Sequence, residues 1–390
     1  MAENKKSTSC NQSPRFDAIN VPVHRASTVL FGSTDEFLTR KSQLYDGYSY
    51  GLYGTPTTRA LEEVVANVEG GLRSILVPSG LAALTHSILA LMQAGDHLLV
   101  ADCVYGPTRD FCTHTLKRLG ISVSFFPADA SSVAQFIQKN TRMVLLESPG
   151  SFSMEIQEIS TICREARSGG ALVMVDNTWG FGISKMPTHG VDIVATALSK
   201  YAAGHSDVCM GSVTVSDEGL YRKLKSFIAG IGSGVSSDDA YLVSRGICTL
   251  DVRLQAQAAR ALEFTTWLRS RPEVQGVLNP ADPLDGQHGR FKAYFSGGNG
   301  LVSVMLQSRG IESIRAMVDG FKTFKIGASW GGTTSLVSIS DLSAVRSVEL
   351  HEPATFLLRF HFGLESMDDL YADLEDGFQR IAAPDKRLAI

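Results

Sequence analysis

The sequence predicts an α/β protein with a mainly parallel central sheet and helices on both of its faces, followed by a smaller α+β domain. Three observations support this fold class. Short apolar runs alternate with helical runs over most of the first 245 residues, which is typical of parallel sheets. Two of these apolar runs lead into a charged residue, Asp176 or Lys200. The alternation changes after about residue 246, so a second domain begins there.

The length of 390 residues also favours more than one domain. We expect a tail and an arm over residues 1–55, an α/β domain over 56–245 and an α+β domain over 246–390. The first 20 residues are polar and predict a disordered tail. Residues 21–55 show little helical periodicity and many Gly, Ser, Thr and Tyr residues, so we expect an arm and not a domain.

Composition excludes several classes of protein. The formal charge of −4 gives no electrostatic reason to expect nucleic acid or an anionic membrane as a partner. No apolar run approaches the ~20 residues that cross a bilayer, and the first residues lack the apolar core of a signal peptide. The six cysteines form no C-x-x-C pair and no metal-binding cluster, and most of them are expected to be buried thiols. A cytoplasmic enzyme without a metal is therefore expected.

The first helix and the turn after it predict an anion site. A helix is expected from Thr57, with apolar residues at helical spacing, and it ends at Gly70. A strand over residues 74–77 then leads into a tight turn at Gly80 and the start of a second helix. The free N–H groups at such a helix start bind anions, although an ordinary strand-to-helix turn looks the same in sequence.

The next elements continue the alternation of strands and helices. We expect strands over 97–101, 123–126 and 143–147, and a helix over 156–168. Tyr105 lies in the loop after the first of these strands, where a lone tyrosine is usually surface packing. Glu147 ends the third strand before a Pro-Gly turn, and we assign it no role in proton transfer.

Two strands, over residues 171–175 and 192–198, deliver Asp176 and Lys200 to one edge of the sheet. Ligands bind beyond the carboxyl ends of parallel strands, so both side chains are expected to face one crevice. Such a pair suits pyridoxal phosphate, because the lysine forms a Schiff base and the aspartate keeps the ring nitrogen protonated. The plainer interpretation is a loop cap and an ordinary cation.

The C-terminal part adds an arginine in an apolar strand. A helix over 250–269 and a strand over 301–305 are expected before Arg359, which lies in an alternating strand pattern. A buried arginine needs an anion, because an unpaired buried charge is costly. That anion is either a structural carboxylate or a ligand. The last helix, with Leu370, Leu374 and Phe378, is expected to pack in the core.

The short motifs VDNTW, SKY and GHSD, followed by a Gly-Ser turn, resemble the transsulfuration (Cys/Met metabolism) family of pyridoxal phosphate-dependent enzymes. The resemblance extends from about residue 21 to the C-terminus and implies the type I fold of these transferases. It implies that Lys200 is the Schiff-base lysine and proton-transfer base, that Asp176 binds the ring nitrogen, and that Tyr105 stacks on the ring and takes part in proton handling. It also implies phosphate contacts and substrate contacts. The phosphate contacts are Gly80, Leu81, Ser199 and Tyr50, and the substrate contacts are Arg359 with Ser329, Trp330 and Tyr50.

Three sequence features match the β-lyase members of that family. They are Pro107 in the motif YGPT, the motif ESPGS, and Trp330. The resemblance therefore implies β-elimination of a small sulfur amino acid, cystathionine, to homocysteine, pyruvate and ammonia. Three alternatives remain. They are another family member such as a γ-synthase, γ-lyase or cysteine-S-conjugate β-lyase, a replacement enzyme of specialised metabolism, and a non-catalytic relative.

One position departs from the family. Relatives usually carry an arginine two residues after Tyr50, and this chain has Leu52, which makes no hydrogen bond to phosphate. Either Arg59, Tyr53 or another donor replaces it, or the cofactor binds more weakly, or the role has diverged. The resemblance further implies that the arm completes a neighbouring subunit's site in a homo-oligomer, a tetramer built as a dimer of dimers.

Overall fold

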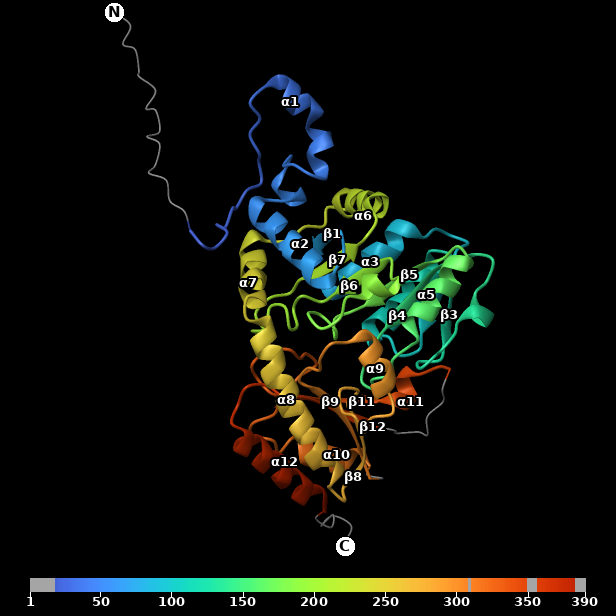
Figure 1. Cartoon of the computed structure of the whole chain (residues 1–390), viewed down its shortest axis with the longest axis vertical. Helices are drawn as coiled ribbons and strands as arrows, with labels where there is room; N and C mark the ends of the chain where they lie inside the picture. The colour runs from blue at the N-terminus through green and yellow to red at the C-terminus, as the bar shows by residue number, and fades with distance from the viewer. Residues whose placement is uncertain (1–17, 308–309, 349–355, 383–390) are drawn as a thin grey trace, which may run out of the picture.

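A computed structural model describes residues 18–307, 310–348 and 356–382. The predicted tail over residues 1–20 lies largely outside these ranges. The upper part of the molecule in Figure 1 contains a seven-stranded sheet, and the lower part contains a five-stranded sheet. The long helix α8 (Leu250–Arg269) runs down from the upper part alongside the lower sheet.

The seven-stranded sheet is mainly parallel, as predicted. Its antiparallel member is β7 (Gly211–Val215), which pairs antiparallel with both of its neighbours. The other strand pairs are parallel. The spatial order is β1 (Arg73–Val77), β7 (Gly211–Val215), β6 (Ile193–Thr196), β5 (Leu172–Asp176), β4 (Thr141–Glu147), β2 (His97–Ala101) and β3 (Ser122–Phe126).

Helices cover both faces of this sheet. They are α2 (Pro56–Glu69), α3 (Gly80–Leu91), α4 (Gly106–Asp110), α5 (Ile159–Ser168), α6 (Glu218–Gly230) and α7 (Ser237–Ile247), with shorter turns η2 (Gly51–Tyr53), η3 (Phe111–Leu116), η4 (Ala134–Phe136) and η5 (Met186–His189). Local sequence signals explain the best defined ends. Thr55 and Thr58 form a capping box at the start of α2, and Gly70 ends this helix in the left-handed conformation.

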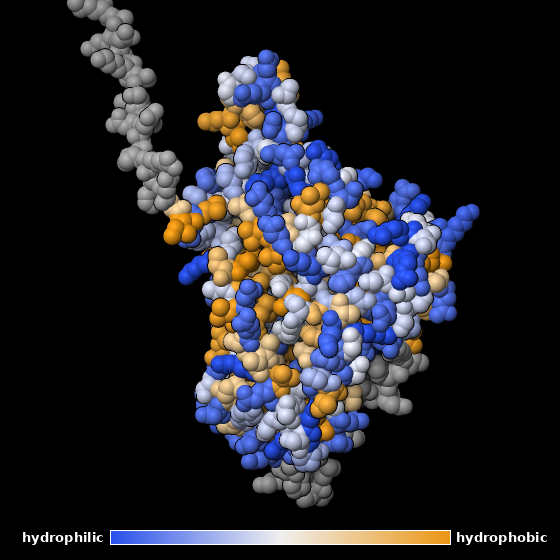
Figure 2. Space-filling view, viewed as in Figure 1, coloured by the Kyte–Doolittle hydropathy of each residue, from blue (hydrophilic) through white to orange (hydrophobic). Residues whose placement is uncertain are grey.

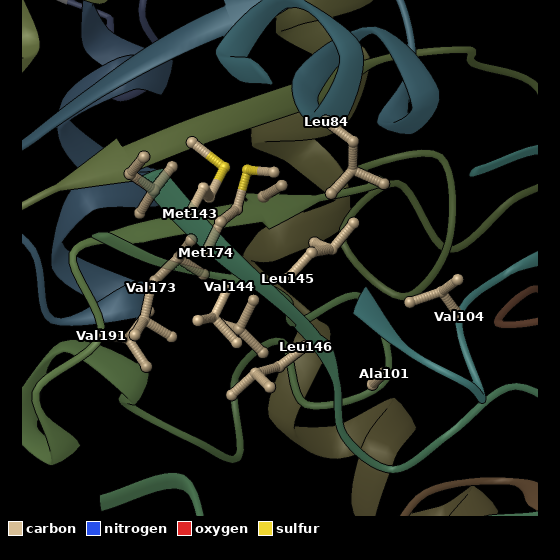
Figure 3. Packing of buried hydrophobic residues seen from close by; sticks show 14 of the residues in the cluster. Leu84, Ala101, Val104, Met143, Val144, Leu145, Leu146, Val173, Met174 and Val191 are labelled. Atoms are coloured by element: carbon tan, nitrogen blue, oxygen red, sulfur yellow. The ribbon is translucent and has the colours of Figure 1, made fainter. Parts of the chain in front are cut away.

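The central strands are apolar along their whole length because both faces of the sheet are covered. Residues 143–146 of β4 are fully buried, as are Val173 to Val175 of β5. Figure 3 shows residues 143–146, Val173 and Met174 packed together in the large core cluster. Burying a side chain of this size contributes about 1.5–3 kcal/mol, so the core fixes the strand ends that carry the polar residues described below.

The second sheet is mostly antiparallel and has its own apolar core. Its spatial order is β10 (Lys325–Ile326), β11 (Leu336–Asp341), β12 (Phe356–His361), β9 (Leu301–Leu306) and β8 (Val274–Leu278). The helices of this part are α8, α9 (His288–Tyr294), α10 (Ile311–Val318), α11 (Leu342–Val345) and α12 (Met367–Ala382). Leu370, Leu374 and Phe378 of α12 are buried in this core.

Three expectations about local structure need correction. The arm contains helix α1 (Thr34–Thr39) and the turn η1 (Arg40–Leu44), because Ser33 caps α1 and acidic residues occupy its first turn. Helix α5 begins at Ile159 and not at residue 156, because Glu158 has a ψ of 72°, which is outside the helical range. Strand β6 ends at Thr196, so Lys200 lies in the following turn and not at the strand end.

The structure also bears on the cysteines and on membranes. Cys103, Cys112 and Cys163 are buried thiols as expected, whereas Cys209 and Cys248 are exposed, and Cys10 lies outside the described residues. Among the helices that the structure describes, none combines the length and apolar character needed to cross a bilayer.

Candidate active site

A pocket of about 430 Å³ lies beyond the carboxyl ends of the central strands, between the two sheets. All of the predicted site residues except Tyr50 line it, although they come from six separate parts of the chain. They are Gly80, Leu81, Tyr105, Asp176, Ser199, Lys200, Ser329, Trp330 and Arg359. Within the described ranges, no group of three His, Cys, Asp or Glu residues is placed to hold a metal.

One end of the pocket is formed by the start of α3. Ser79 caps this helix by accepting from the N–H of Ala82, 3.1 Å away, and Gly80 is the first helical residue. A Cβ atom on Gly80 would lie 2.4 Å from the Cβ of Ala197, so only glycine allows this close packing. The first N–H groups of a helix have no partner within it and carry partial positive charge. This end of the pocket can therefore bind an anion such as a phosphate.

Ser199 faces the same pocket, but its hydroxyl already has partners. It donates to the carbonyl of Met210 at 3.1 Å and accepts from the N–H of Met210 at 2.9 Å. The hydroxyl must turn away from this carbonyl before it can donate to a phosphate. Its predicted role remains a proposal.

Asp176 ends β5 with a half-buried side chain. The Oδ1 atom accepts from the N–H of Thr178 at 2.9 Å and from the hydroxyl of the same residue. The Thr178 hydroxyl also accepts from the N–H of Ala197, which links Asp176 to the turn that carries Lys200. Burial raises the pKa of Asp176, while the bonds from Thr178 and the charge of Lys200 oppose this rise. A cationic ring nitrogen placed here would favour the ionised carboxylate.

Lys200 lies opposite, on the turn after β6. Its Nζ donates to the hydroxyl of Ser329 at 2.7 Å and lies 5.6 Å from the centre of the Trp330 ring. Burial, followed by the nearby charge of Arg359, lowers the pKa of Lys200 to about 8. An amine with this pKa is partly neutral at ordinary pH, which makes it a good nucleophile and base.

Arg359 reaches the pocket from β12 of the second sheet. Its side chain is only 7% exposed, and it donates to the carbonyl of Ala328 at 3.2 Å. Its guanidinium carbon lies 4.6 Å from the centre of the Phe152 ring. No carboxylate of the described residues forms an ion pair with it, and burial lowers its pKa to about 10. A buried guanidinium without a carboxylate partner is suited to bind an anionic ligand.

Glu147 also lines the pocket, although no role was assigned to it from the sequence. It ends β4 directly beside Asp176 in the strand register, and its Oε2 accepts from the N–H of Tyr105 at 2.6 Å. The sequence did contain a signal for it: a carboxylate at the end of a buried strand, like Asp176. The following Pro-Gly turn offered a simpler explanation.

Tyr50 does not join the pocket of its own chain. It is 44% exposed and lines a hollow on the arm with Phe31, Phe37 and Tyr53. Arg59 is one candidate to replace the phosphate-binding arginine for which this chain has Leu52, but its guanidinium already has hydrogen-bond partners. It donates to Glu62 and to the carbonyl of Leu44, both at 2.9 Å.

Comparisons with known proteins agree with this geometry. Residues 6–379 match the family described as Cys/Met metabolism PLP-dependent enzyme. The chain is 38% identical to a cystathionine beta-lyase of Bordetella avium over 93% of both chains. It is also 35% identical to an L-alanine/L-glutamate racemase of Wolbachia pipientis wMel, again over 93% of both. A solved structure of a cystathionine gamma synthase from Xanthomonas oryzae, in complex with aminoacrylate and cysteine, matches with a TM-score of 0.85. That structure is 27% identical to this chain and covers 94% of both.

Proposed function

Because the chain belongs to the Cys/Met metabolism family of pyridoxal phosphate-dependent enzymes, we propose that it is a carbon–sulfur β-lyase that cleaves L-cystathionine to homocysteine, pyruvate and ammonia. One observation carries the proposal. The amine of Lys200, the carboxylate of Asp176 and the guanidinium of Arg359 all line a single pocket. These are a base, a partner for the cofactor ring and an anchor for an amino acid.

The residues present fit the cofactor. The N–H groups of Gly80 and Leu81 can hold its phosphate, Asp176 its ring nitrogen and Lys200 its aldehyde carbon, with the ring of Tyr105 beside it. When bound, pyridoxal phosphate supplies an electron-withdrawing ring that stabilises negative charge at the Cα atom of the substrate. Asp176 supports this role because its negative charge keeps a proton on the ring nitrogen.

The side chains of the protein bind the substrate and move its proton. Arg359 binds the α-carboxylate of the substrate and thereby orients its Cα–H bond. Lys200 then removes the Cα proton, and its lowered pKa of about 8 provides a neutral amine for that step. The Cβ–S bond breaks, and the sulfur leaves as a thiolate. Ser329, which contacts the Lys200 amine at 2.7 Å, keeps the base in place.

The products formed from L-cystathionine show which type of reaction the protein catalyses. The purified protein is first tested for the yellow absorbance of a lysine-bound cofactor and is then incubated with L-cystathionine while pyruvate and free thiol are measured. Equal amounts of both support the proposal. Formation of 2-oxobutyrate indicates cleavage at Cγ, D-amino acid without pyruvate indicates a racemase, and product only with an added nucleophile indicates a replacement enzyme. Any of these three outcomes contradicts the β-lyase proposal.

A matched control uses Lys200→Ala, which removes the amine but keeps the fold of the turn. We expect this variant to lose the absorbance band and the turnover together. Elimination that survives in Lys200→Ala would show that another group acts as the base.

The remaining assignments are part of the same proposal. The proposed division into three domains has boundaries near residues 55 and 245, and the change of sheet between β7 and β8 supports the second boundary. A homo-oligomer, most simply a dimer of dimers, would bring Tyr50 of one arm to the phosphate end of a neighbouring pocket. The cytoplasm is the proposed location, and small sulfur amino acids are the proposed substrates.

A further inference from the structure

Glu147 has no part in the steps above, yet its side chain lies in the active site. It lines the main pocket, and it also borders a smaller cavity of about 30 Å³ together with Asp176, Trp330 and Arg359. Its Cα is paired with that of Asp176 in the parallel register of β4 and β5. Two half-buried carboxylates therefore lie side by side at the floor of the site.

Glu147 also connects two loops that shape the pocket. One carboxylate oxygen, Oε2, accepts from the backbone N–H of Tyr105 at 2.6 Å. The other, Oε1, accepts from the hydroxyl of Ser151. Tyr105 and Ser151 both line the pocket, so one side chain fixes the backbone of the loop on which Tyr105 lies and the side chain of a second wall residue. A glutamate that only stabilised the Pro-Gly turn would need neither contact with Tyr105 nor a place beside Asp176.

The charged and titratable groups that face Glu147 come from several elements. They are Asp176 on β5, Arg346 after α11, Arg359 on β12 and the thiol of Cys103 after β2. Burial, followed by the charge of Asp176, raises the pKa of Glu147 to about 8. Because the pKa of each is raised, the two carboxylates together carry less than two full negative charges at neutral pH. A cationic ring nitrogen beside them favours the ionised form of both.

We propose that Glu147 is a positioning residue for the reaction: it fixes the Tyr105 loop at the edge of the cofactor site, and its carboxylate, next to Asp176, helps to keep the proton on the cofactor ring nitrogen. The inference deepens the proposed function and rests on it only for the cofactor, not for the identity of the sulfur substrate.

Two variants separate the two parts of this role. Glu147→Gln keeps the shape of the side chain and an oxygen that accepts from Tyr105, but removes the charge. Glu147→Ala removes both. Glu155→Gln is the matched control, because Glu155 lies 3.7 Å from Arg346 in the same polar cluster, and the residues that line the main pocket do not include it. Each variant is compared as holoenzyme.

The main measurement needs no substrate. The ring nitrogen of ¹⁵N-labelled bound cofactor is titrated with pH and followed by NMR. We expect the midpoint in Glu147→Gln to fall by about 0.5 to 1 pH unit, because loss of a nearby anion disfavours the protonated, cationic form. We expect kcat to fall about tenfold with KM changed less than about twofold, since charge beside the ring acts in the chemical step. Glu147→Ala is expected to weaken cofactor binding in addition, measured by fluorescence titration.

The outcomes decide the proposal in both directions. A wild-type midpoint and a wild-type kcat in Glu147→Gln overturn it. An equal shift in Glu155→Gln also overturns it, because the effect would then not be specific to the position of Glu147. If Glu147→Ala does not fold, the Gln variant still decides the charge. A shifted midpoint in a protein that does not cleave cystathionine supports this inference while contradicting the proposed substrate.

Discussion

Two cations, the half-buried Lys200 and the buried Arg359, determine the chemistry available at the level of single residues. Burial lowers the pKa of both, and the charge of Arg359 lowers the pKa of Lys200 further. Lys200 responds by becoming a better base. Arg359 stays charged, since its pKa of about 10 is still well above neutral pH. A substrate carboxylate therefore finds a guanidinium that has carbonyl partners but no carboxylate partner among the described residues.

Arg359→Ala should chiefly weaken substrate binding. Loss of a charged hydrogen-bonding partner costs about 1.5–3 kcal/mol, so we expect the KM for the sulfur amino acid to rise about 10- to 150-fold, with a smaller effect on kcat. Steady-state kinetics at saturating cofactor provide the measurement. Arg359→Lys, which keeps a charge but loses the planar fork, should lie between the two. An unchanged KM in Arg359→Ala would contradict the carboxylate role.

At the level of elements, the site depends on polar contacts behind the strands. Glu69 ends α2, is fully buried, and accepts from the side-chain amide of Asn177 at 2.7 Å and from the hydroxyl of Thr196. Asn177 follows Asp176, and Thr196 ends β6 before the Lys200 turn. A single carboxylate thus ties helix α2 to both of the strands that carry the active residues. Burial raises the pKa of Glu69 to about 7.

The raised pKa of Glu69 predicts a loss of stability as the pH rises. In the unfolded chain the carboxyl group ionises near its ordinary value of 4.5, while in the fold it ionises near pH 7. Between these values the folded state holds the extra proton, so stability decreases with increasing pH and the loss is complete above about pH 7. The decrease is at most about 3 kcal/mol, because one pKa unit corresponds to about 1.4 kcal/mol.

Glu69→Gln should flatten this part of the pH profile. Urea unfolding of the holoenzyme, measured at several pH values between 4.5 and 8, provides the test. Glu63→Gln is the control, since Glu63 lies exposed on the same helix. If the wild-type and Glu69→Gln profiles fall in parallel, Glu69 is not the group responsible.

A second contact between elements joins the C-terminal part to the Tyr105 loop. The buried carboxylate of Asp102 accepts from the N–H groups of Ser347 and Val348, at 2.8 and 2.9 Å, and from Arg109. Arg346 donates to the carbonyls of Asp102 and Ser151, at 2.9 and 3.2 Å. The segment after α11 therefore holds two walls of the pocket together.

Asp102→Asn should loosen this connection. Removal of one partner from a buried charged pair costs about 3–5 kcal/mol, so we expect the urea midpoint to fall and kcat to fall with it. Asp110→Asn, at an exposed position on the same segment, is the control. Wild-type stability in Asp102→Asn would show that the fold does not depend on these bonds.

At the scale of the whole molecule, the arm is the part that bears on assembly. It extends from the body in Figure 1 and carries apolar surface in Figure 2. Its exposed residues include Leu30, Phe37, Leu38, Tyr50 and Leu52. A contact with a second copy of the chain would bury this surface and would bring Tyr50 to a pocket that it does not reach in its own chain.

Mixing two defective variants tests whether the arm completes a neighbouring site. Lys200→Ala and Tyr50→Ala are expected to be weakly active or inactive alone. A mixed dimer contains one site with both residues intact if Tyr50 acts across subunits. Random mixing should then restore about a quarter of the wild-type activity, because half of the dimers are mixed and half of their sites are intact. No recovery after coexpression would contradict an exchanged arm. Tyr50→Phe is a control for the hydroxyl group.

Much of the fold could be predicted because local signals agree with one another. The capped helix α2 and helix α8 lie where the apolar spacing placed them, and the apolar strands β4 and β5 form the centre of the sheet. Helix α1 was missed because it has six residues and no buried face, so its cap at Ser33 was the main signal. The end of β6 was missed because a side chain far along the chain, Thr178, takes the N–H of Ala197.

The sequence by itself determined the type of fold, the family and nine of the twenty residues that line the pocket, because strand patterns, turn residues and short motifs are local properties. Only the tertiary structure decided which groups meet. It brought Arg359 from the second sheet towards Lys200, and it placed Glu147 beside Asp176 through strand register. It also left Tyr50 outside its own pocket. Such neighbours depend on the order of strands and on the packing of two cores, and their shared burial sets the pKa values on which the chemistry depends.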